Sequence, residues 1–202
     1  MVFCAFSENQ TMQGKEMKND VLSKEVTLFQ LSDGTMEEAV KSLRRQGIRV
    51  CLEIAKKGET KKTIQIRNQS VERILDDLVG EFDDYSWSLQ EHGCLVKIHP
   101  KGKSVLKWNV RSLRIENRSF FDVLVREDLL GFKEHGIMVF YRGFSQPLEV
   151  LVDIEIDEQS VSTCFDNLVS QVPELCWTLS TNPKGIRVLT FQFVKGSEPQ
   201  SK

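Results

Sequence analysis

The order of apolar and polar positions predicts a strand, a helix and a strand in residues 64–89 and again in residues 154–179. Each segment begins with apolar residues that alternate with polar ones, which is the period of a half-buried strand. A serine and an apolar stripe at helical spacing follow, and a tryptophan and a leucine close the segment. The two segments align without a gap at Ile64/Ile154, Ile66/Ile156, Gln69/Gln159, Ser70/Ser160, Val71/Val161, Asp76/Asp166, Leu78/Leu168, Val79/Val169, Trp87/Trp177 and Leu89/Leu179.

The shared residues have structural explanations. Ser70 and Ser160 are suited to cap the two helices, because a serine hydroxyl accepts a hydrogen bond from a free first-turn amide. Trp87 and Trp177 alternate with polar residues, so we expect core positions for them rather than ligand stacking. The helix stripes are Val71, Ile74, Leu75 and Leu78, and Val161, Cys164, Phe165 and Leu168. The expected hairpin turns are residues 91–93 and 182–185, and the closing strands are residues 95–98 and 186–194.

The region before the first repeated segment predicts a strand, a capped helix and a second strand. Thr35 and Glu38 fit a capping box, and Gly47 is placed to end the helix in a left-handed conformation. A charged loop at residues 56–62 then leads into the repeat. The strands are expected at residues 26–31 and 48–54, and the apolar face of the helix consists of Met36, Ala39, Val40 and Leu43.

The region before the second repeated segment has the same order. A linker at residues 100–103 precedes strand-like residues within 104–115. Ser119 is expected to cap a helix that carries Phe120, Val123 and Leu124 and ends near Gly131 or Gly136. A strand at residues 137–141 and a loop at 143–147 complete the unit.

The chain is therefore expected to be an α+β protein of two similar modules. Each module reads β-α-β-β-α-β-β, with two helices packed on a small mixed sheet. The expected boundaries are a flexible leader at 1–25, modules at 26–99 and 104–194, and a disordered tail at 195–202.

Bulk properties narrow the classes of function. The 202 residues are 40% apolar, which suits globular burial, and carry a net charge of −2. This charge gives no basic field, so nucleic acid is a poor candidate for a partner. No apolar run approaches the roughly 20 residues of a membrane-spanning helix.

The first residues leave two interpretations open. Residues 1–6 are apolar, and Ala5 and Ser7 are spaced like the small residues before a signal-peptidase site. The stretch is shorter than a complete signal and follows no basic region. It is either the remnant of a signal that begins upstream or an ordinary apolar terminus.

No catalytic, cofactor-binding or metal-binding motif is found in the sequence. The cysteines contain no C-x-x-C pair, and Cys164 on a helix stripe is expected to be a buried thiol, while spacing assigns no disulfide among the others. No glycine pattern resembles a phosphate loop. The cysteines are Cys4, Cys51, Cys94, Cys164 and Cys176, and the isolated histidines His92, His99 and His135 are expected to be solvated.

Paired charges are also expected to be solvated. Adjacent aspartates at 76–77 and 83–84 do not share a helix face or fit a calcium loop. Lys41, Arg44 and Arg45 lie on or near the polar face of the first helix, where a solvated surface is favoured over an anion site.

Residues 29–53, FQLSDGTMEEAVKSLRRQGIRVCLE, resemble the start of the secretin and TonB short N-terminal (STN) domain. Residues 68–98, NQSVERILDDLVGEFDDYSWSLQEHGCLVKI, are similar to the second strand-helix-strand part of that family, and the second module matches more loosely. The resemblance implies a non-enzymatic periplasmic domain that contacts other proteins. No secretin channel region follows in this sequence, so it favours a free-standing adaptor over a transport role.

We therefore expect an interaction protein of the bacterial cell envelope or periplasm that binds through a strand edge or a helix face, with a cytoplasmic location left open. Its partner would be another protein, such as an outer-membrane or envelope complex. The alternative is a small-ligand or peptide-binding protein with its site between the modules. An enzyme is the weakest of the three hypotheses.

Overall fold

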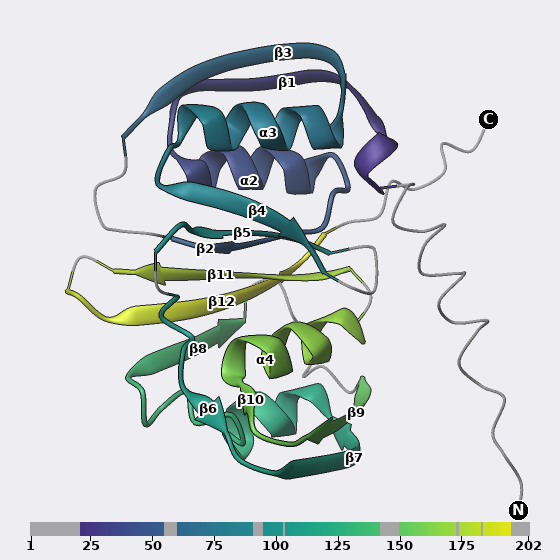
Figure 1. Cartoon of the computed structure of the whole chain (residues 1–202), viewed down its shortest axis with the longest axis vertical. Coiled ribbons are helices and arrows are strands. Elements are labelled where there is room, and N and C mark those ends of the chain that lie inside the picture. The colour runs from purple at the N-terminus through teal and green to yellow at the C-terminus, as the bar shows by residue number, and fades with distance from the viewer. Residues whose placement is uncertain are drawn as a thin grey trace, which may run out of the picture.

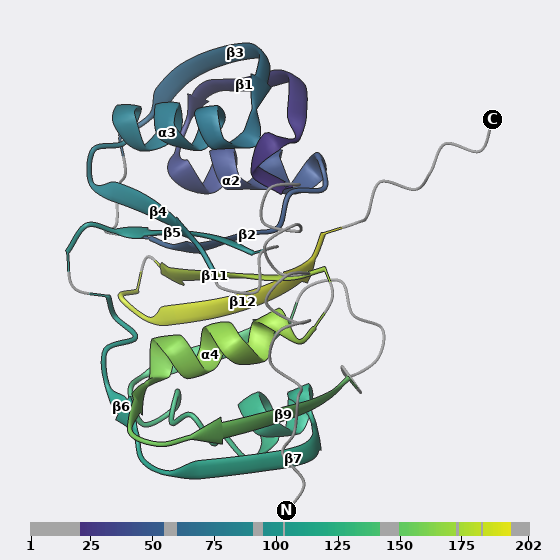
Figure 2. The same ribbon diagram turned by 45° about the vertical axis from the view of Figure 1, so that its right-hand side comes forward.

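The computed structural model describes residues 21–54, 60–90, 95–102, 104–141, 150–172, 174–182 and 184–194. Its centre is a mixed six-stranded sheet with the strand order β4-β5-β2-β11-β12-β8. Helices and two-stranded ribbons lie on both sides of this sheet (Figures 1 and 2), which confirms the α+β class. The strands of the sheet are β4 (Tyr85–Leu89), β5 (Val96–Pro100), β2 (Val50–Glu53), β11 (Leu175–Thr181), β12 (Arg187–Phe193) and β8 (Ile137–Tyr141).

The first half of the chain places two helices between the sheet and an antiparallel ribbon. The ribbon pairs β1 (Glu25–Gly34) with β3 (Lys62–Ser70). Helices α2 (Met36–Arg45) and α3 (Val71–Glu81) lie beneath it in Figure 1 and bury their predicted stripes. The local sequence pattern is sufficient to predict the buried faces of these helices, because each stripe packs against strands of its own half.

Local signals fix the ends of these helices as the sequence predicts. Thr35 and Glu38 form the capping box of α2, and Gly47 follows the helix with a φ of 76°. Ser70 accepts a hydrogen bond from a first-turn amide of α3, and Ser160 does the same for α4 (Val161–Ser170). These contacts satisfy amides that have no partner inside a helix.

The second half repeats this arrangement on the opposite side of the sheet. An antiparallel ribbon pairs β7 (Leu113–Ser119) with β9 (Leu151–Ile156), and α4 lies between it and the sheet. A two-residue pair joins β6 (Asn109–Val110) to β10 (Gln159–Ser160). Figure 2 shows α2 and α3 on one side of the sheet and α4 on the other.

The helix expected after Ser119 is wrong in length and type. Only η1 (Asp122–Arg126), a five-residue π-helical turn, forms there, although the Ser119 hydroxyl does accept from the Asp122 amide at 3.1 Å. The Asp128 carboxylate binds the amides of Phe132 and Lys133 at 2.8 and 2.9 Å, and its own φ is 49°. An aspartate that binds nearby amides in this way competes with helix formation.

The strand expected within residues 104–115 is also wrong in its first part. Residues 104–108 form no strand, and β6 and β7 begin only at Asn109 and Leu113. Leu106 is buried and Trp108 donates its indole N–H to the Leu130 carbonyl at 2.9 Å. These apolar side chains thus enter the core from an irregular segment.

Several pairings correspond between the halves. The order β4-β5-β2 in the first half matches β11-β12-β8 in the second, with the same relative directions. Both ribbons have a register irregularity in their first strand, where Asp33 and Asn117 have φ values of 46° and 50°. A duplicated unit predicts such correspondences, and the interpretation of the chain as two related modules stays a prediction.

The buried apolar residues form two clusters, and Cys51 and Leu95 of the first half belong to the cluster of the second half. The two tryptophans differ in burial. Trp177 is 0% exposed, whereas Trp87 is only partly buried at the edge of the sheet. The expectation that both are core residues is therefore wrong for Trp87. Its indole N–H instead donates to the Asp76 carboxylate at 2.9 Å.

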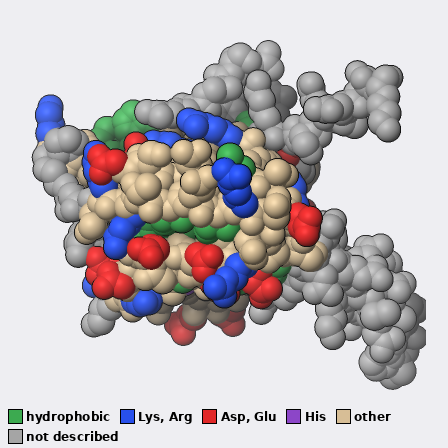
Figure 3. Space-filling view, turned by 90° about the horizontal axis from the view of Figure 1, so that it is seen from above, with side chains coloured by type: hydrophobic (Ala, Val, Ile, Leu, Met, Phe, Trp, Pro, Cys, Tyr) green, Lys and Arg blue, Asp and Glu red, His purple; other side chains and the backbone are tan. Residues whose placement is uncertain are grey.

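The outer face of the first ribbon is mixed in character. Figure 3 looks onto it and shows charged side chains of both signs around a narrow apolar strip. The leader expected at 1–25 ends too late, because Val21 and Leu22 pack against the first core and Glu25 begins β1. Residues 1–20, the turn at 91–93, the loop at 143–147, the tail at 195–202 and most of the loop at 56–62 lie outside the described residues.

Candidate functional site

The two halves join where β2 pairs with β11 in parallel. Leu52 lies beside Thr178 and Glu53 beside Leu179, and the Ile54 amide donates to the Leu179 carbonyl at 2.9 Å. The sequence predicts a separate small sheet for each module, whereas this pairing joins three strands of each half into one six-stranded sheet.

Arg44 on α2 reaches across this junction. It is 5% exposed and donates to the Trp177 carbonyl at 2.7 Å, the Thr178 hydroxyl at 3.0 Å and the Val50 carbonyl at 2.7 Å. Burial lowers the pKa of its guanidinium. The expectation that Arg44 belongs to a solvated face is wrong, because its partners on β11 come from the other half of the chain.

Arg49 binds the end of α4. Its guanidinium donates to the carbonyls of Val169, Val172 and Leu175 at 3.0 to 3.3 Å. Carbonyls at a helix C-terminus lack partners within the helix and carry partial negative charge, which a cation stabilises.

Lys97 on β5 forms a buried ion pair with Asp166 on α4. Their charged atoms are 2.6 Å apart, and the ammonium also donates to the Ser162 hydroxyl at 2.7 Å. It lies 5.4 Å from the centre of the Trp177 ring. Burial raises the pKa of the Asp166 carboxyl, against the opposite effect of Lys97. Within the described parts of the chain, the Asp166 Oδ1 and Trp177 Nε1 atoms have no hydrogen-bond partner.

Two buried thiols lie close to these arginines. A hydrogen bond with Cys51, helped by Arg44 and Arg49, lowers the pKa of Cys176 to about 7 against the opposing effect of burial. Burial raises the pKa of Cys51 well above its usual value. Cys164 is buried as expected, burial raises its pKa, and all three thiols are free.

The Cys176 thiol makes the free energy of unfolding depend on pH. The folded pKa of Cys176 lies below the ~8.5 of an unfolded cysteine, so the unfolded chain binds more protons between these values. The contribution of Cys176 to the free energy of unfolding is present above pH ~8.5 and lost as the pH falls through about 7. Urea unfolding under reducing conditions is expected to show a greater gain in stability from pH 6.5 to 8.5 for the parent than for Cys176→Ala. Cys164→Ala is the matched control and should keep the parent's gain; an equal gain in Cys176→Ala would contradict the shift.

A polar cavity of about 230 Å³ lies beside the junction. The Glu53 carboxylate, which is 1% exposed, accepts hydrogen bonds there from the Ser104 hydroxyl and the Val105 amide. The charged residues Glu53 and Lys97, which line this cavity, therefore already bind other groups of the protein. The lining residues are Glu53, Ser88, Gln90, Lys97, His99, Pro100, Gly102, Ser104 and Ser162.

An apolar groove of about 610 Å³ follows the other end of the sheet. It lies along β8, whose outer side pairs with no strand in the described part of the chain. Met138 and Phe140 are 47% and 46% exposed, and Ile186 beside them is 37% exposed. The lining residues are Leu124, Lys133, Gly136, Ile137, Met138, Val139, Phe140 and Ile186.

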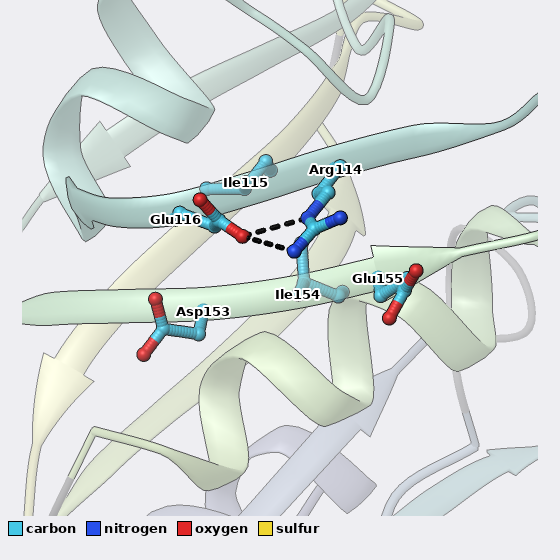
Figure 4. A pocket seen from close by; sticks show the side chains of 6 residues that line it. All are labelled: Arg114, Ile115, Glu116, Asp153, Ile154 and Glu155. Atoms are coloured by element: carbon cyan, nitrogen blue, oxygen red, sulfur yellow. Dashed lines mark hydrogen bonds and ion pairs between the residues drawn. The ribbon is translucent and has the colours of Figure 1, made fainter.

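A third hollow, on the β7–β9 ribbon, is a charged surface. Figure 4 shows Arg114 bound to Glu116, while Asp153 and Glu155 point away from that pair. The side chains of Arg114 and Glu116 are 70% and 65% exposed, so solvent screens their attraction. Asp153 accepts from the Asn117 amide at 2.7 Å and supports the ribbon.

The other residues singled out from the sequence do not come together. His135 is exposed and stacks on Trp108, and His99 is half-buried within 3.4 Å of the Ser86 hydroxyl. Asp83 and Asp84 are exposed, as expected. Among the described residues no cluster of His, Cys, Asp or Glu could hold a metal ion.

Comparisons with known proteins identify no relative. No family model, no curated protein and no solved structure matches the chain. In the part of the chain that the structure describes, every helix is too short or too polar to cross a membrane.

Proposed function

We propose that the protein is a non-enzymatic interaction protein that binds another protein along the free edge of β8. The observation that carries the proposal is the apolar groove along this edge strand. Three of the large apolar side chains that are exposed in the described residues, Met138, Phe140 and Ile186, lie in it. An exposed apolar edge of this kind is a template for strand addition.

Strand addition uses two kinds of contact. The outward amides and carbonyls of β8 provide main-chain hydrogen bonds to an extended segment of the partner. Side chains above and below the edge then select its sequence, because successive residues of a strand point to opposite faces. Met138 and Phe140 are exposed on one face of β8, whereas Ile137 and Val139 on the other face pack in or against the core.

The junction supports a structural role for the charged residues rather than a catalytic one. Arg44, Arg49 and Lys97 donate to backbone carbonyls or to groups of the other half. Charged groups that are bound in this way hold the two halves together.

The resemblance to STN domains agrees with this proposal and suggests the cell envelope or periplasm as its location. In that setting a free-standing adaptor would contact an envelope protein. This part of the proposal depends on fold analogy.

The second candidate function is binding of a small polar ligand beside the junction. The cavity of about 230 Å³ lined by Ser88, Gln90 and His99 favours it. Thermal-shift screening with metabolite classes tests it, and a specific rise in melting temperature that Gln90→Leu abolishes would support it.

Phe140→Lys is expected to weaken partner binding at least about tenfold, because a charge replaces the central apolar contact of the edge. Stability should change by no more than about 0.5 kcal/mol, since the side chain is 46% exposed. Cross-linking in the source organism followed by mass spectrometry measures recovery of the partner.

Leu28→Lys is the matched control, because Leu28 is 44% exposed on a different strand, β1. It should recover the same partner as the parent. Equal recovery with Phe140→Lys, or loss only with Leu28→Lys, would place the binding surface elsewhere.

A further inference from the structure

The junction between the halves provides a template for covering the free edge. It pairs β2, the last strand of the first half in sheet order, with β11, the first strand of the second half. The corresponding strands are β8 and β4, which are the two edges of the six-stranded sheet. Among the described residues neither edge has a strand partner on its outer side.

The two halves are related head to tail. β2 is parallel to β11, β11 is antiparallel to β12, and β12 is parallel to β8, so β2 and β8 run in opposite directions. The helices of the two halves also lie on opposite sides of the sheet (Figure 2). A half-turn about an axis across the strands, with a shift of three strands, relates the halves. Such an interface uses two different surfaces and can repeat without closing.

Side chains at the two edges of the sheet are more exposed than the corresponding side chains at the junction. Trp177 is 0% exposed: its ring packs against Phe165 and Lys97, and its backbone amide donates to the Cys51 thiol of β2. Its counterpart Trp87 is partly buried. Phe140 corresponds to Cys51, because each occupies the same place beside its paired strand, and it is 46% exposed.

We propose that a second copy of this chain adds its β4 to β8 of the first, in parallel and in the register of β2 and β11. The inference rests on the proposed function and names the partner of the same edge. In this register Phe140 of one copy lies beside Trp87 of the next, as Cys51 lies beside Trp177. Their contact buries further the exposed Phe140 and the partly buried Trp87.

The contact between copies differs in chemistry from the internal junction. Arg49 and Lys97, which bind α4 across the junction, correspond to Met138 and Thr190 beside β8. Apart from Lys133, which also lines the groove, the contact is therefore apolar and lacks these two cations. Added salt should leave it unchanged or strengthen it, since no attraction between charges is screened.

Disulfide trapping tests the pairing and its register. Phe140→Cys and Trp87→Cys are made in separate chains in which serines replace Cys4 and Cys94, and the two proteins are mixed under mild oxidation. A linked dimer is expected, because adjacent strands hold paired residues within the roughly 4.4–6.8 Å Cα separation of a disulfide. Within one chain the two positions lie five strand spacings of ~4.8 Å apart, which excludes an internal bond.

Two controls give the test its specificity. Ser88→Cys points to the opposite face of β4 and should not link to Phe140→Cys. Leu28→Cys is as exposed as Phe140 but lies on the ribbon and should not link to it either. Equal linking of all three pairs would overturn the proposed register and indicate random collision.

Sedimentation velocity provides a second test without the Trp87 substitution. Phe140→Lys blocks the β8 edge and Leu89→Lys blocks the β4 edge, so each variant alone should be monomeric or, at most, much less associated than the parent. Their mixture should form a one-to-one dimer, because each supplies the edge that the other lacks. The parent should form a series of oligomers whose size increases with concentration.

The outcomes separate this inference from the proposed function. If no specific disulfide forms and the parent is monomeric at all concentrations, a second copy is not the partner. Recovery of a different cross-linked protein, lost in Phe140→Lys, would then leave the proposed function intact. A dimer that persists in Phe140→Lys would overturn the head-to-tail arrangement.

Discussion

Trp177→Ala is expected to lower the free energy of unfolding by about 3–5 kcal/mol, the cost of truncating a large core aromatic. Trp177 is 0% exposed and packs against Phe165, with ring centres 5.3 Å apart. It also contacts Lys97 across the junction, so its loss leaves a cavity where the two halves meet. Chemical denaturation followed by circular dichroism measures the effect.

Trp87→Ala is the matched control, because it is the aligned tryptophan at the free edge of the sheet. It should cost clearly less, since the side chain is only partly buried against the first core; the loss includes its hydrogen bond to Asp76, worth about 1 kcal/mol. Equal losses for the two variants would mean that the edge tryptophan is covered in the free protein.

Lys97→Met is expected to lower the free energy of unfolding by about 3–5 kcal/mol, because it leaves the Asp166 charge buried without its partner. Their side chains are only 8% and 7% exposed. Replacing both residues, with Lys97→Met and Asp166→Leu, should cost much less than the sum of the single changes. A double-mutant cycle from urea unfolding measures this coupling.

The exposed pair Arg114 and Glu116 provides the control cycle. Its coupling should be no more than about 1 kcal/mol, because solvent screens exposed charges. If the coupling energy of Lys97 and Asp166 is as small as this, the junction tolerates an unpaired charge. Water then reaches the pair more easily than its burial indicates.

The sequence predicts the parts of the fold that depend on neighbouring residues. Thr35, Glu38, Ser70 and Ser160 act within one helical turn, so their spacing is sufficient to place the helix starts. The apolar stripes succeed for the same reason, because each packs within its own half.

The joining of the halves is not visible in local patterns. The sequence predicts Arg44 on or near a polar helix face, yet its partners Trp177 and Thr178 lie more than a hundred residues away. The local sequence around Lys97 likewise does not distinguish it from a surface lysine. Only the fold brings Asp166 on α4 against it. No apolar or polar period records which strand will lie beside another in a sheet.

The candidate edge is only partly predictable. The sequence predicts that residues 137–141 form a strand and that the partner binds a strand edge or a helix face, but not which strand is the edge. Met138 and Phe140 alternate with Ile137 and Val139, and both sets are apolar. That pattern also fits a strand buried on both faces, and only the sheet order shows that one side of β8 is open.

Amide hydrogen exchange of the purified protein, alone and bound to the partner recovered by cross-linking, tests strand addition along β8 most directly. Added main-chain hydrogen bonds should slow exchange in the peptide that contains residues 137–141, while the peptide that contains residues 25–34 of the distant ribbon keeps its rate. If the partner instead protects the ribbon and leaves residues 137–141 unchanged, binding along the β8 edge is contradicted.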